Sequence, residues 1–331
     1  MIRIAVDAMG GDRAPDEIVA GALEARSPSI EPILFGPPGL ETHGLELVVA
    51  PEVIGMDEKP AEAVRAKPSS SLVAACRAVG EGRADAVVSA GNTGAMLAAG
   101  LLEIRRLKGV LRPGIAAVIP ARYGATVLID SGANADARVE HLLQFAQMGA
   151  VFAEEILERP NPVVRLLSIG EEPEKGNQLT LEAHELLRGS GLNFGGNAEA
   201  RELLLFAADV VVCDGFTGNV VLKLLEGTIK ELLDALRQEI SGSTRGKLGG
   251  LLIRPAARRL RDRLDPDTYG GAYLLGLRGL SVIAHGTSGR RAIANAIRLA
   301  ARGVEHGVVE RLTDRMVVDS ARPEVPTNQA R

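Results

Sequence analysis

Residues 210–219 read VVVCDGFTGN, and this stretch decides the fold. Its first four residues are all apolar and do not alternate with polar ones, which is typical of a strand buried on both faces of a parallel sheet. A polar, glycine-rich turn follows, and then an apolar-periodic segment that predicts a helix over residues 222–240. A buried strand that leads through a turn into a helix indicates right-handed β-α-β units and a layered α/β architecture.

The same alternation continues along the chain. Further short, β-branched runs predict strands at residues 2–7, 32–35, 46–50, 84–89, 115–119, 126–130, 163–169 and 280–284. Helical patterns occupy residues 71–79, 139–156, 198–207 and 288–301. We therefore expect a three-layer α/β/α sandwich with a mostly parallel sheet. No repeat or linker divides the chain, so residues 1–318 should form one large α/β domain and residues 319–331 a flexible tail.

The composition excludes several classes of protein. The 38 Lys and Arg against 42 Asp and Glu give a net charge of −4, and the aromatic residues are only 3 Tyr and 6 Phe. A nucleic-acid binder usually carries a basic, aromatic-bearing face, so that class is not expected. Two cysteines fit a reducing compartment, and no apolar stretch approaches the ~20 residues of a membrane-spanning helix. Strand-like sequence from Ile2 leaves no signal peptide, so we expect a cytoplasmic protein.

A basic segment interrupts the alternation at about residues 241–268, where we expect a helical hairpin. Between residues 245 and 263, seven basic residues are opposed only by Asp262, and a cluster of Leu and Ile lies among them. Two interpretations stay open. The hairpin either packs its apolar face on the domain or on a dimer partner, or it is a peripheral membrane anchor whose arginines meet anionic headgroups. The candidate membrane or carrier contacts are Leu251, Leu252, Ile253, Arg254, Arg258 and Arg259.

Glycine accounts for 38 of the 331 residues, above an ordinary usage of roughly 7%. Much of the excess lies in five turns after predicted strands, at residues 7–12, 89–94, 130–134, 214–219 and 284–289. Glycine permits close backbone approach, and helix N-termini offer unpaired N–H groups to anions. Because ligands of parallel sheets bind at the carboxyl ends of strands, we expect all five turns to share one polar cleft.

Several familiar site signatures are missing. The chain contains no GxGxxG, no P-loop, no GxSxG, no HExxH and no paired CxxC, so a nucleotide site, a nucleophile elbow and a zinc site have no support. Cys213 is interpreted as a buried small apolar residue. Among the five histidines, His285 alone lies in a glycine turn where it can meet a ligand. A cleft of this kind can hold inorganic phosphate and let it attack an electrophile directly.

A series of motifs gives the chain a resemblance to a known family. In order they are DAMGGD (7–12), KPSSSL (67–72), VSAGNTGA (88–95), EKGNQLT (174–180), VVVCDGFTGNVVLK (210–223), YGGAYLLGL (269–277) and AHGTSG (284–289). This series resembles the bacterial phosphate acyltransferases of phospholipid synthesis, from Ile2 to about Ala301. The resemblance implies a fold similar to that of isopropylmalate dehydrogenases and phosphate acetyltransferases.

The resemblance also implies an activity and partners. Acyl-acyl carrier protein would react with inorganic phosphate to give acyl phosphate and free carrier, and a separate membrane acyltransferase would pass the acyl group to glycerol 3-phosphate. A homodimer, peripheral attachment to the inner face of the membrane, and no cofactor are further implications. The chain departs from the family pattern at Arg13, Ser168, Leu181 and Tyr273, which bears on the acyl or carrier contacts and leaves the glycine-rich motifs intact.

Catalytic roles are expected for three residues. Lys175 would supply positive charge to phosphate, and Asn92 would donate to the oxyanion of the tetrahedral intermediate, although turn formation by its short polar side chain is the alternative. Asp214 would either accept or orient a proton of phosphate or only cap a helix, and both interpretations stay open. The expected phosphate and substrate contacts are Gly91, Thr93, Gly94, Asn134, Gly215, Thr217, Gly218, Asn219 and His285, and the cleft-shaping residues are Asp7, Gly10, Gly11 and Asp12.

Two other classes of enzyme and one class of binding protein remain alternatives. A phosphate acetyltransferase-like enzyme would use acyl-coenzyme A, and a decarboxylating dehydrogenase would need a nicotinamide and a divalent metal. A non-catalytic lipid- or carrier-binding protein would bind without phosphate-dependent loss of the thioester.

Overall fold

A computed structural model describes residues 1–264, 268 and 270–320. The strands in it are β1 (Ile2–Asp7), β2 (Ile30–Gly36), β3 (Glu46–Val49), β4 (Ala86–Ser89), β5 (Gly114–Ala121), β6 (Gly124–Ile129), β7 (Val164–Ser168), β8 (Phe194–Glu199), β9 (Val210–Val212), β10 (Ala272–Leu275) and β11 (Leu280–Ile283). They form one sheet in the order β3-β2-β1-β4-β11-β10-β5-β6-β9-β7-β8.

The sheet is mostly parallel but changes direction near its middle. Strands β3, β2, β1, β4 and β11 are parallel to one another, and so are β6, β9, β7 and β8. Between these two sets, β10 is antiparallel to both β11 and β5, and β5 is antiparallel to β6. The two sets therefore point in opposite directions, and their carboxyl ends lie at opposite edges of the sheet.

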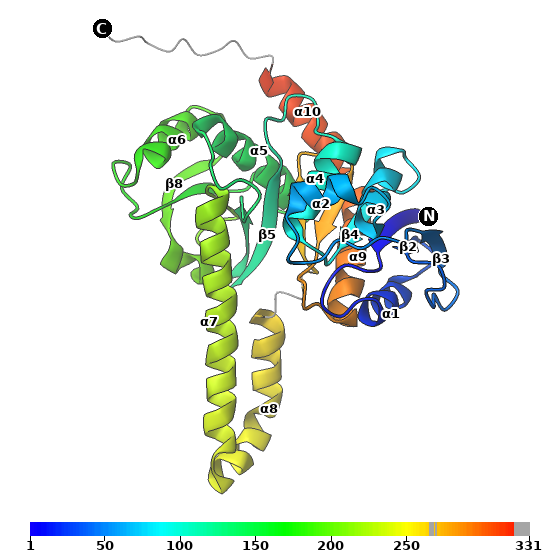
Figure 1. The fold of residues 1–331 in the computed structure, drawn as a ribbon. Helices are drawn as coiled ribbons and strands as arrows, with labels where there is room; N and C mark the ends of the chain where they lie inside the picture. The colour runs from blue at the N-terminus through cyan, green and yellow to red at the C-terminus, as the bar shows by residue number, and fades with distance from the viewer. Residues whose placement is uncertain (265–267, 269, 321–331) are drawn as a thin grey trace.

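Helices cover both faces of the sheet, which confirms the predicted three-layer α/β/α architecture (Figure 1). One face packs against α1 (Asp16–Ala25), α5 (Val139–Glu155), α6 (Gln178–Arg188), α9 (Arg290–Glu305) and α10 (Val308–Ser320). The other face packs against α2 (Pro60–Ala66), α3 (Ser71–Gly80) and α4 (Thr93–Ala99) over the first set of strands, and against the start of α7 (Gly215–Ser241) over the second.

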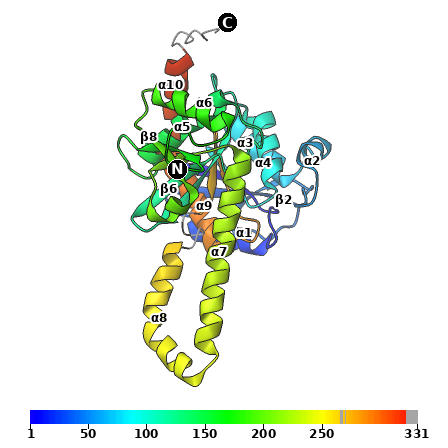
Figure 2. The ribbon, with the colours of Figure 1, turned by 90° about the vertical axis from the view of Figure 1, so that its left-hand side faces the viewer.

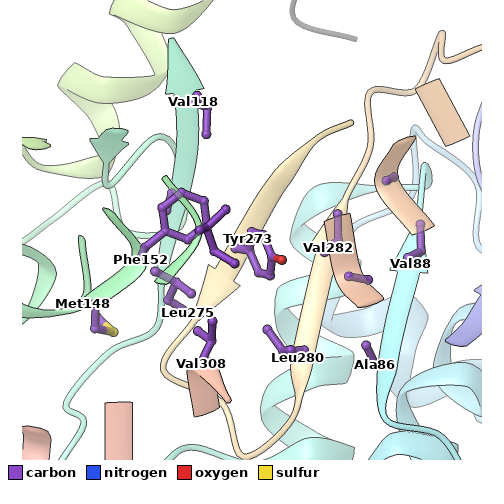
Figure 3. Packing of buried hydrophobic residues seen from close by; sticks show 14 of the residues in the cluster. Ala86, Val88, Val118, Met148, Phe152, Tyr273, Leu275, Leu280, Val282 and Val308 are labelled. Carbon is purple, nitrogen blue, oxygen red and sulfur yellow. The ribbon is translucent and has the colours of Figure 1, made fainter. Parts of the chain in front are cut away.

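The largest buried side chain of the core is Tyr273 on β10, which the sequence marks as a departure from the family. Its ring packs edge-on against Phe152 of α5 with 5.0 Å between ring centres, and its hydroxyl donates to the carbonyl of Leu299 (Figure 3). A buried Tyr needs such a partner for its hydroxyl. Tyr273 therefore belongs to the core on the α5 and α9 face and does not face the helices α4 and α7.

The predicted elements agree with the observed ones except at residues 198–207. The predicted helix there is wrong, because β8 continues to Glu199 and a 3-10 helix then spans Ala200–Leu205. Pairing with β7 holds the glycine-containing β8 extended, so tertiary contacts override the local pattern. The strands β8 and β10 were not expected, and both contain or adjoin glycines that weaken a strand signal.

A hairpin confined to about residues 241–268 is not what forms, because one helix, α8 (Thr244–Leu264), occupies this segment. α8 pairs with the second half of α7, and the hairpin of these two helices projects away from the sheet (Figures 1 and 2). α8 has no buried residue and contains Pro255. Within the described part of the chain, no helix is both long and apolar enough to span a bilayer. Residues 321–331 of the expected tail lie outside the described residues.

Candidate active site

The turns after β1, β4 and β11 form a first group of polar residues. Asp7 ends β1, is 2% exposed, and accepts a hydrogen bond from Ser89 Oγ at 2.7 Å. The same Ser89 oxygen accepts from the backbone N–H of Gly91 at 3.0 Å, and the N–H of Asp12 donates to the carbonyl of Gly286 at 2.8 Å. Burial is the main cause that raises the pKa of Asp7 above its usual value.

Close backbone approach explains the glycines of this first group. A Cβ at Gly10 would lie 2.4 Å from Asp7 Oδ2 and 2.8 Å from the nitrogen of Gly91, so no other residue fits. Gly11 has a φ of 103° and faces the carbonyls of Gly286 and Ala90. Gly10 and Gly11 therefore let the turn after β1 lie directly against the turns after β4 and β11.

Asn92 fixes the loop of residues 51–59 above the start of α4. Its Oδ1 accepts from the N–H of Ala95 at 3.1 Å as an N-cap, and its Nδ2 donates to the carbonyls of Met56 at 3.1 Å and Glu58 at 3.2 Å. The two hydrogens of the amide are therefore both engaged. Lys67 closes the same loop, because its Nζ donates to Glu58 Oε1 at 2.6 Å and to the carbonyl of Val53 at 2.8 Å.

The turns after β6 and β9 form a second group, which is built around the buried carboxylate of Asp130. Its two oxygens accept from the N–H groups of Ile115, Gly132, Ala133 and Asn134 and from Asn134 Nδ2. The Nδ2 of Asn134 also donates to the carbonyl of Pro113 at 2.7 Å, and the N–H of Gly215 donates to the carbonyl of Asn134 at 2.8 Å. Asn134 thus ties three chain segments together.

Asp214 caps α7. Its Oδ1 accepts from the N–H of Thr217 at 2.9 Å, and its Oδ2 accepts from the hydroxyl of Thr217 at 2.7 Å. A Cβ at Gly218 would lie 1.9 Å from the carbonyl oxygen of Asp130, so the first turn of α7 rests directly on the turn after β6. These contacts are those of the capping interpretation of Asp214.

The five glycine turns do not share one edge of the sheet, and that expectation is corrected. β11 and β4 run opposite to β6 and β9, so the first group and the second group lie at opposite edges. The reversal arises from β10 and β5, which are antiparallel to their neighbours. A run of consecutive apolar residues predicts that a strand is buried on both faces. It does not predict whether that strand runs parallel or antiparallel to its neighbours in the sheet.

α7 connects the two groups. It begins in the second group and reaches the first, where Lys223 Nζ lies 3.5 Å from His285 Nε2. The Lys223 Nζ also donates to Glu226 Oε2 at 3.0 Å, and His285 Nδ1 lies 2.8 Å from the hydroxyl of Thr287. A pocket of about 530 Å³ continues along α7 from this pair; its lining residues are Lys223, Leu224, Gly227, Thr228, Glu231 and Leu232.

Sequence reasoning missed Lys223. The signal was present, because Lys223 ends the motif VVVCDGFTGNVVLK and lies four residues after Asn219, hence on the same side of the helix. Thr93, Asn219 and His285 are exposed, as a ligand contact requires. This end of the site therefore presents a cation, an imidazole and the start of α4, which together can hold an anion. At the start of α9, the carboxylate of Glu17 already accepts from the N–H of Arg290 at 2.6 Å.

Lys175 lies apart from both groups in the loop between β7 and α6. It is exposed, and its carbonyl accepts a hydrogen bond from Ser168 Oγ at 2.8 Å. Ser168, a departure from the family pattern, thus holds the backbone at Lys175. No hydrogen bond or ion pair joins the Lys175 ammonium to another side chain within residues 1–264, 268 and 270–320.

The cysteines are not placed for covalent chemistry. Cys213 is 3% exposed and its thiol contacts the carbonyl of Asp130 at 3.5 Å, which confirms the interpretation of a buried small residue. Burial raises the pKa of the Cys213 thiol well above its ordinary value, so the thiolate is disfavoured. Among the residues that the structure describes, no three His, Cys, Asp or Glu side chains gather as a metal site would require.

Comparison with known sequences matches nearly the whole chain. A family described as fatty acid synthesis protein matches residues 2–311. A phosphate acyltransferase of Heliobacterium modesticaldum is 48% identical over 320 residues, which cover 93% of this chain and 96% of that protein. A phosphate acyltransferase of Desulfitobacterium hafniense (strain Y51) is 49% identical over 323 residues, which cover 94% of this chain and 96% of that protein.

Solved structures share the fold at low sequence identity. A branched-chain phosphotransacylase from Enterococcus faecalis superimposes with a TM-score of 0.60 at 16% identity and covers 92% of this chain and all of its own. The EutD phosphotransacetylase from Staphylococcus aureus gives a TM-score of 0.59 at 15% identity, with 92% of this chain and 94% of that chain covered. These two proteins therefore share the overall fold of this chain.

Proposed function

The chain belongs to the fatty acid synthesis protein family, and from this premise we propose that it transfers an acyl group from acyl-acyl carrier protein to inorganic phosphate. It is an enzyme of acyl transfer, the class of its phosphate acyltransferase relatives. The observation that carries the choice of phosphate as the acceptor is the meeting of Lys223 and His285 beside the glycine-rich turns of the first group.

In this proposal phosphate binds against Lys223, His285 and the backbone N–H groups at the start of α4. One phosphate oxygen attacks the thioester carbon, a carbon–oxygen bond forms and the carbon–sulfur bond breaks. The proton of hydrogen phosphate passes to the departing thiolate, so the products are acyl phosphate and the free thiol of the carrier. The protein supplies orientation and electrostatic stabilisation, and no covalent intermediate is needed.

In this mechanism, two of the three expected catalytic residues, Asn92 and Asp214, position parts of the site, and the third, Lys175, is assigned no step. Asn92 positions the loop of residues 51–59, because both of its amide hydrogens are engaged there. Asp214 lies nine residues before Lys223 on the same helix, about 14 Å away at 1.5 Å per residue, and so holds the start of α7 and does not contact the same phosphate. Lys175 stays a prediction, as a cation in the loop after β7, which lies at the same edge of the sheet as the second group.

The α7–α8 hairpin supports two further parts of the proposal. Exposed leucines on α7, namely Leu224, Leu232 and Leu236, suit packing against the hairpin of a second copy in a homodimer. On α8, Leu251 and Leu252 are 63% and 84% exposed beside the exposed Arg254, which suits peripheral contact with an anionic membrane. An acyl phosphate formed there would pass to a membrane acyltransferase for phospholipid synthesis.

The decisive experiment is a phosphate-dependent thioester assay with the purified chain and acyl-acyl carrier protein. We expect loss of the thioester and appearance of acyl phosphate only when inorganic phosphate is present. Turnover of acyl-coenzyme A with none of the acyl-carrier substrate would favour the acetyltransferase-like alternative, to which the fold likeness to phosphotransacetylases gives some weight. Binding of the carrier without phosphate-dependent turnover would overturn an enzymatic role with this substrate.

A further inference from the structure

A cationic pocket lies away from the hairpin, on the loop between the π-helix (Gly100–Ile104) and β5. It has a volume of about 470 Å³, and its lining includes the exposed side chains of Arg105, Arg106, Lys108 and Arg278. Within the described part of the chain, no carboxylate pairs with Arg105, Lys108 or Arg278. Unpaired positive charges gathered on one surface attract an acidic partner and speed its association.

The backbone under these cations is held by hydrogen bonds. The N–H of Leu107 donates to the carbonyl of Gly276 at 3.0 Å, and the N–H of Arg278 donates to the carbonyl of Arg105 at 2.9 Å. Arg106 braces the loop, because its guanidinium donates to the carbonyls of Val110 and Leu111. The loop therefore presents Arg105, Lys108 and Arg278 from a fixed platform, and less ordering is needed when a partner binds.

Arg105 has an uncommon backbone conformation. Its φ is 72° and its ψ is 160°, a region that side chains other than glycine rarely adopt, and it directly follows the π-helix. A π-helical turn and a strained residue side by side are found most often at functional sites. The conformation has no part in the phosphate chemistry proposed above, because Arg105 lies at the opposite edge of the sheet from Lys223 and His285.

Two exposed leucines lie close to Arg105 and Lys108 along the chain, just outside the lining of the pocket. Leu102 is 55% exposed and Leu111 is 44% exposed, and each belongs to the same π-helix and loop. A pocket that binds only a small anion does not need exposed apolar side chains beside it. Apolar side chains within a charged surface are typical of a protein interface, where the apolar contacts contribute affinity and the charges contribute orientation.

We propose that this surface, formed by Leu102, Arg105, Lys108, Leu111 and Arg278, docks the acidic acyl carrier protein. The choice of this partner rests on the proposed function, and the charge of the surface is complementary to it. The loop continues to Pro113, whose carbonyl accepts from Asn134 Nδ2, so the docked carrier lies next to the second group of the site. The hairpin projects from the opposite edge, which leaves carrier docking and membrane contact free to occur together (Figure 1).

The test measures binding of acyl carrier protein to the full chain by isothermal titration calorimetry. The variant Lys108→Glu/Arg278→Glu should weaken binding at least about tenfold at low salt and flatten its salt dependence. Arg254→Glu/Arg258→Glu on α8 tests the competing basic surface with the same change in net charge, and the matched control is Arg65→Glu/Arg122→Glu, at two exposed arginines outside both surfaces. A thermal melt of these variants checks that they fold, and a Leu102→Ser variant, which keeps every charge, should also weaken binding.

Measurements of KM and kcat distinguish the proposed docking surface from the proposed function. In the phosphate-dependent assay, Lys108→Glu/Arg278→Glu should raise KM for the acyl-carrier substrate about tenfold and leave kcat within about twofold, since the residues touch no reacting atom. Unchanged KM in that variant, or a larger loss in the α8 variant, would place the carrier elsewhere while the function stands. Absence of turnover by the unaltered chain would overturn the function, and the carrier as partner with it.

Discussion

Lys223 Nζ lies 3.5 Å from His285 Nε2, although 62 residues separate the two positions in the chain. This contact joins α7, which begins at one edge of the sheet, to the turn after β11 at the other edge. The two sets of strands thus contribute to one site even though they point in opposite directions. A cation and an imidazole placed together at a glycine-rich turn can stabilise the negative charge of phosphate and of the transition state.

Replacement of Lys223 tests this site most directly. Lys223→Ala should lower kcat/KM for phosphate at least about 10²-fold, because one preorganised cation is lost where charge develops. The readout is the rate of phosphate-dependent thioester loss as a function of phosphate concentration. Lys230→Ala, an exposed lysine two turns further along α7, is the matched control and should stay near the unaltered rate. Similar rates for both variants would place phosphate elsewhere.

Substitutions of Asp214 distinguish a helix-capping role of this side chain from a proton-accepting role. Asp214→Asn keeps a side-chain oxygen for the N–H of Thr217, and Asn caps helices about as well as Asp, so we expect activity within a few-fold of the unaltered chain. Asp214→Ala should lose about 1 kcal/mol in the free energy of unfolding. Urea unfolding and the thioester assay on both variants give the answer. A loss of about 10² or more in the Asn variant with its stability unchanged would instead make Asp214 the proton acceptor.

The sequence predicted the elements better than the site they form. Consecutive apolar residues located β9 and β4, because burial on both faces leaves a clear pattern. The directions of β5 and β10 depend on long connections and on packing between distant segments, which local periodicity does not encode. The sequence therefore identifies the glycine turns but not the edge of the sheet at which each lies. It also places Lys223 in a motif beside Asn219, but it does not show that Lys223 meets His285.

Asp7 should give the chain a characteristic dependence of stability on pH. Burial raises its pKa above the ordinary value of 3.8, so the folded state holds the proton more tightly than the unfolded state. Between the two pKa values the folded state binds more protons, so the stability contributed by Asp7 is fully present below pH 3.8 and falls as pH rises through the folded pKa. The slope for one proton is at most about 1.4 kcal/mol per pH unit.

Urea unfolding of Asp7→Asn between about pH 4 and pH 7 checks this sign. The unaltered chain should lose stability relative to the variant as pH rises, since the amide side chain of the variant does not ionise. Gln238→Ala serves as the control, because it removes an exposed side chain that does not ionise and should give a difference that does not change with pH. A difference for Asp7 that stays constant, or that changes in the opposite direction, would contradict the effect of burial.

The α8 leucines test membrane contact. Burying two leucine side chains in the interface contributes at least about 3 kcal/mol, a factor of about 10² in partitioning, so Leu251→Glu/Leu252→Glu should abolish flotation with vesicles that contain anionic lipid. Ile169→Glu/Leu205→Glu is the matched control, because these exposed apolar residues lie on the body of the domain and not on the hairpin. The control should float with the vesicles as the unaltered chain does. Flotation of the α8 variant at the same level would remove the membrane role of α8 and leave a dimer partner as the cover for its apolar face.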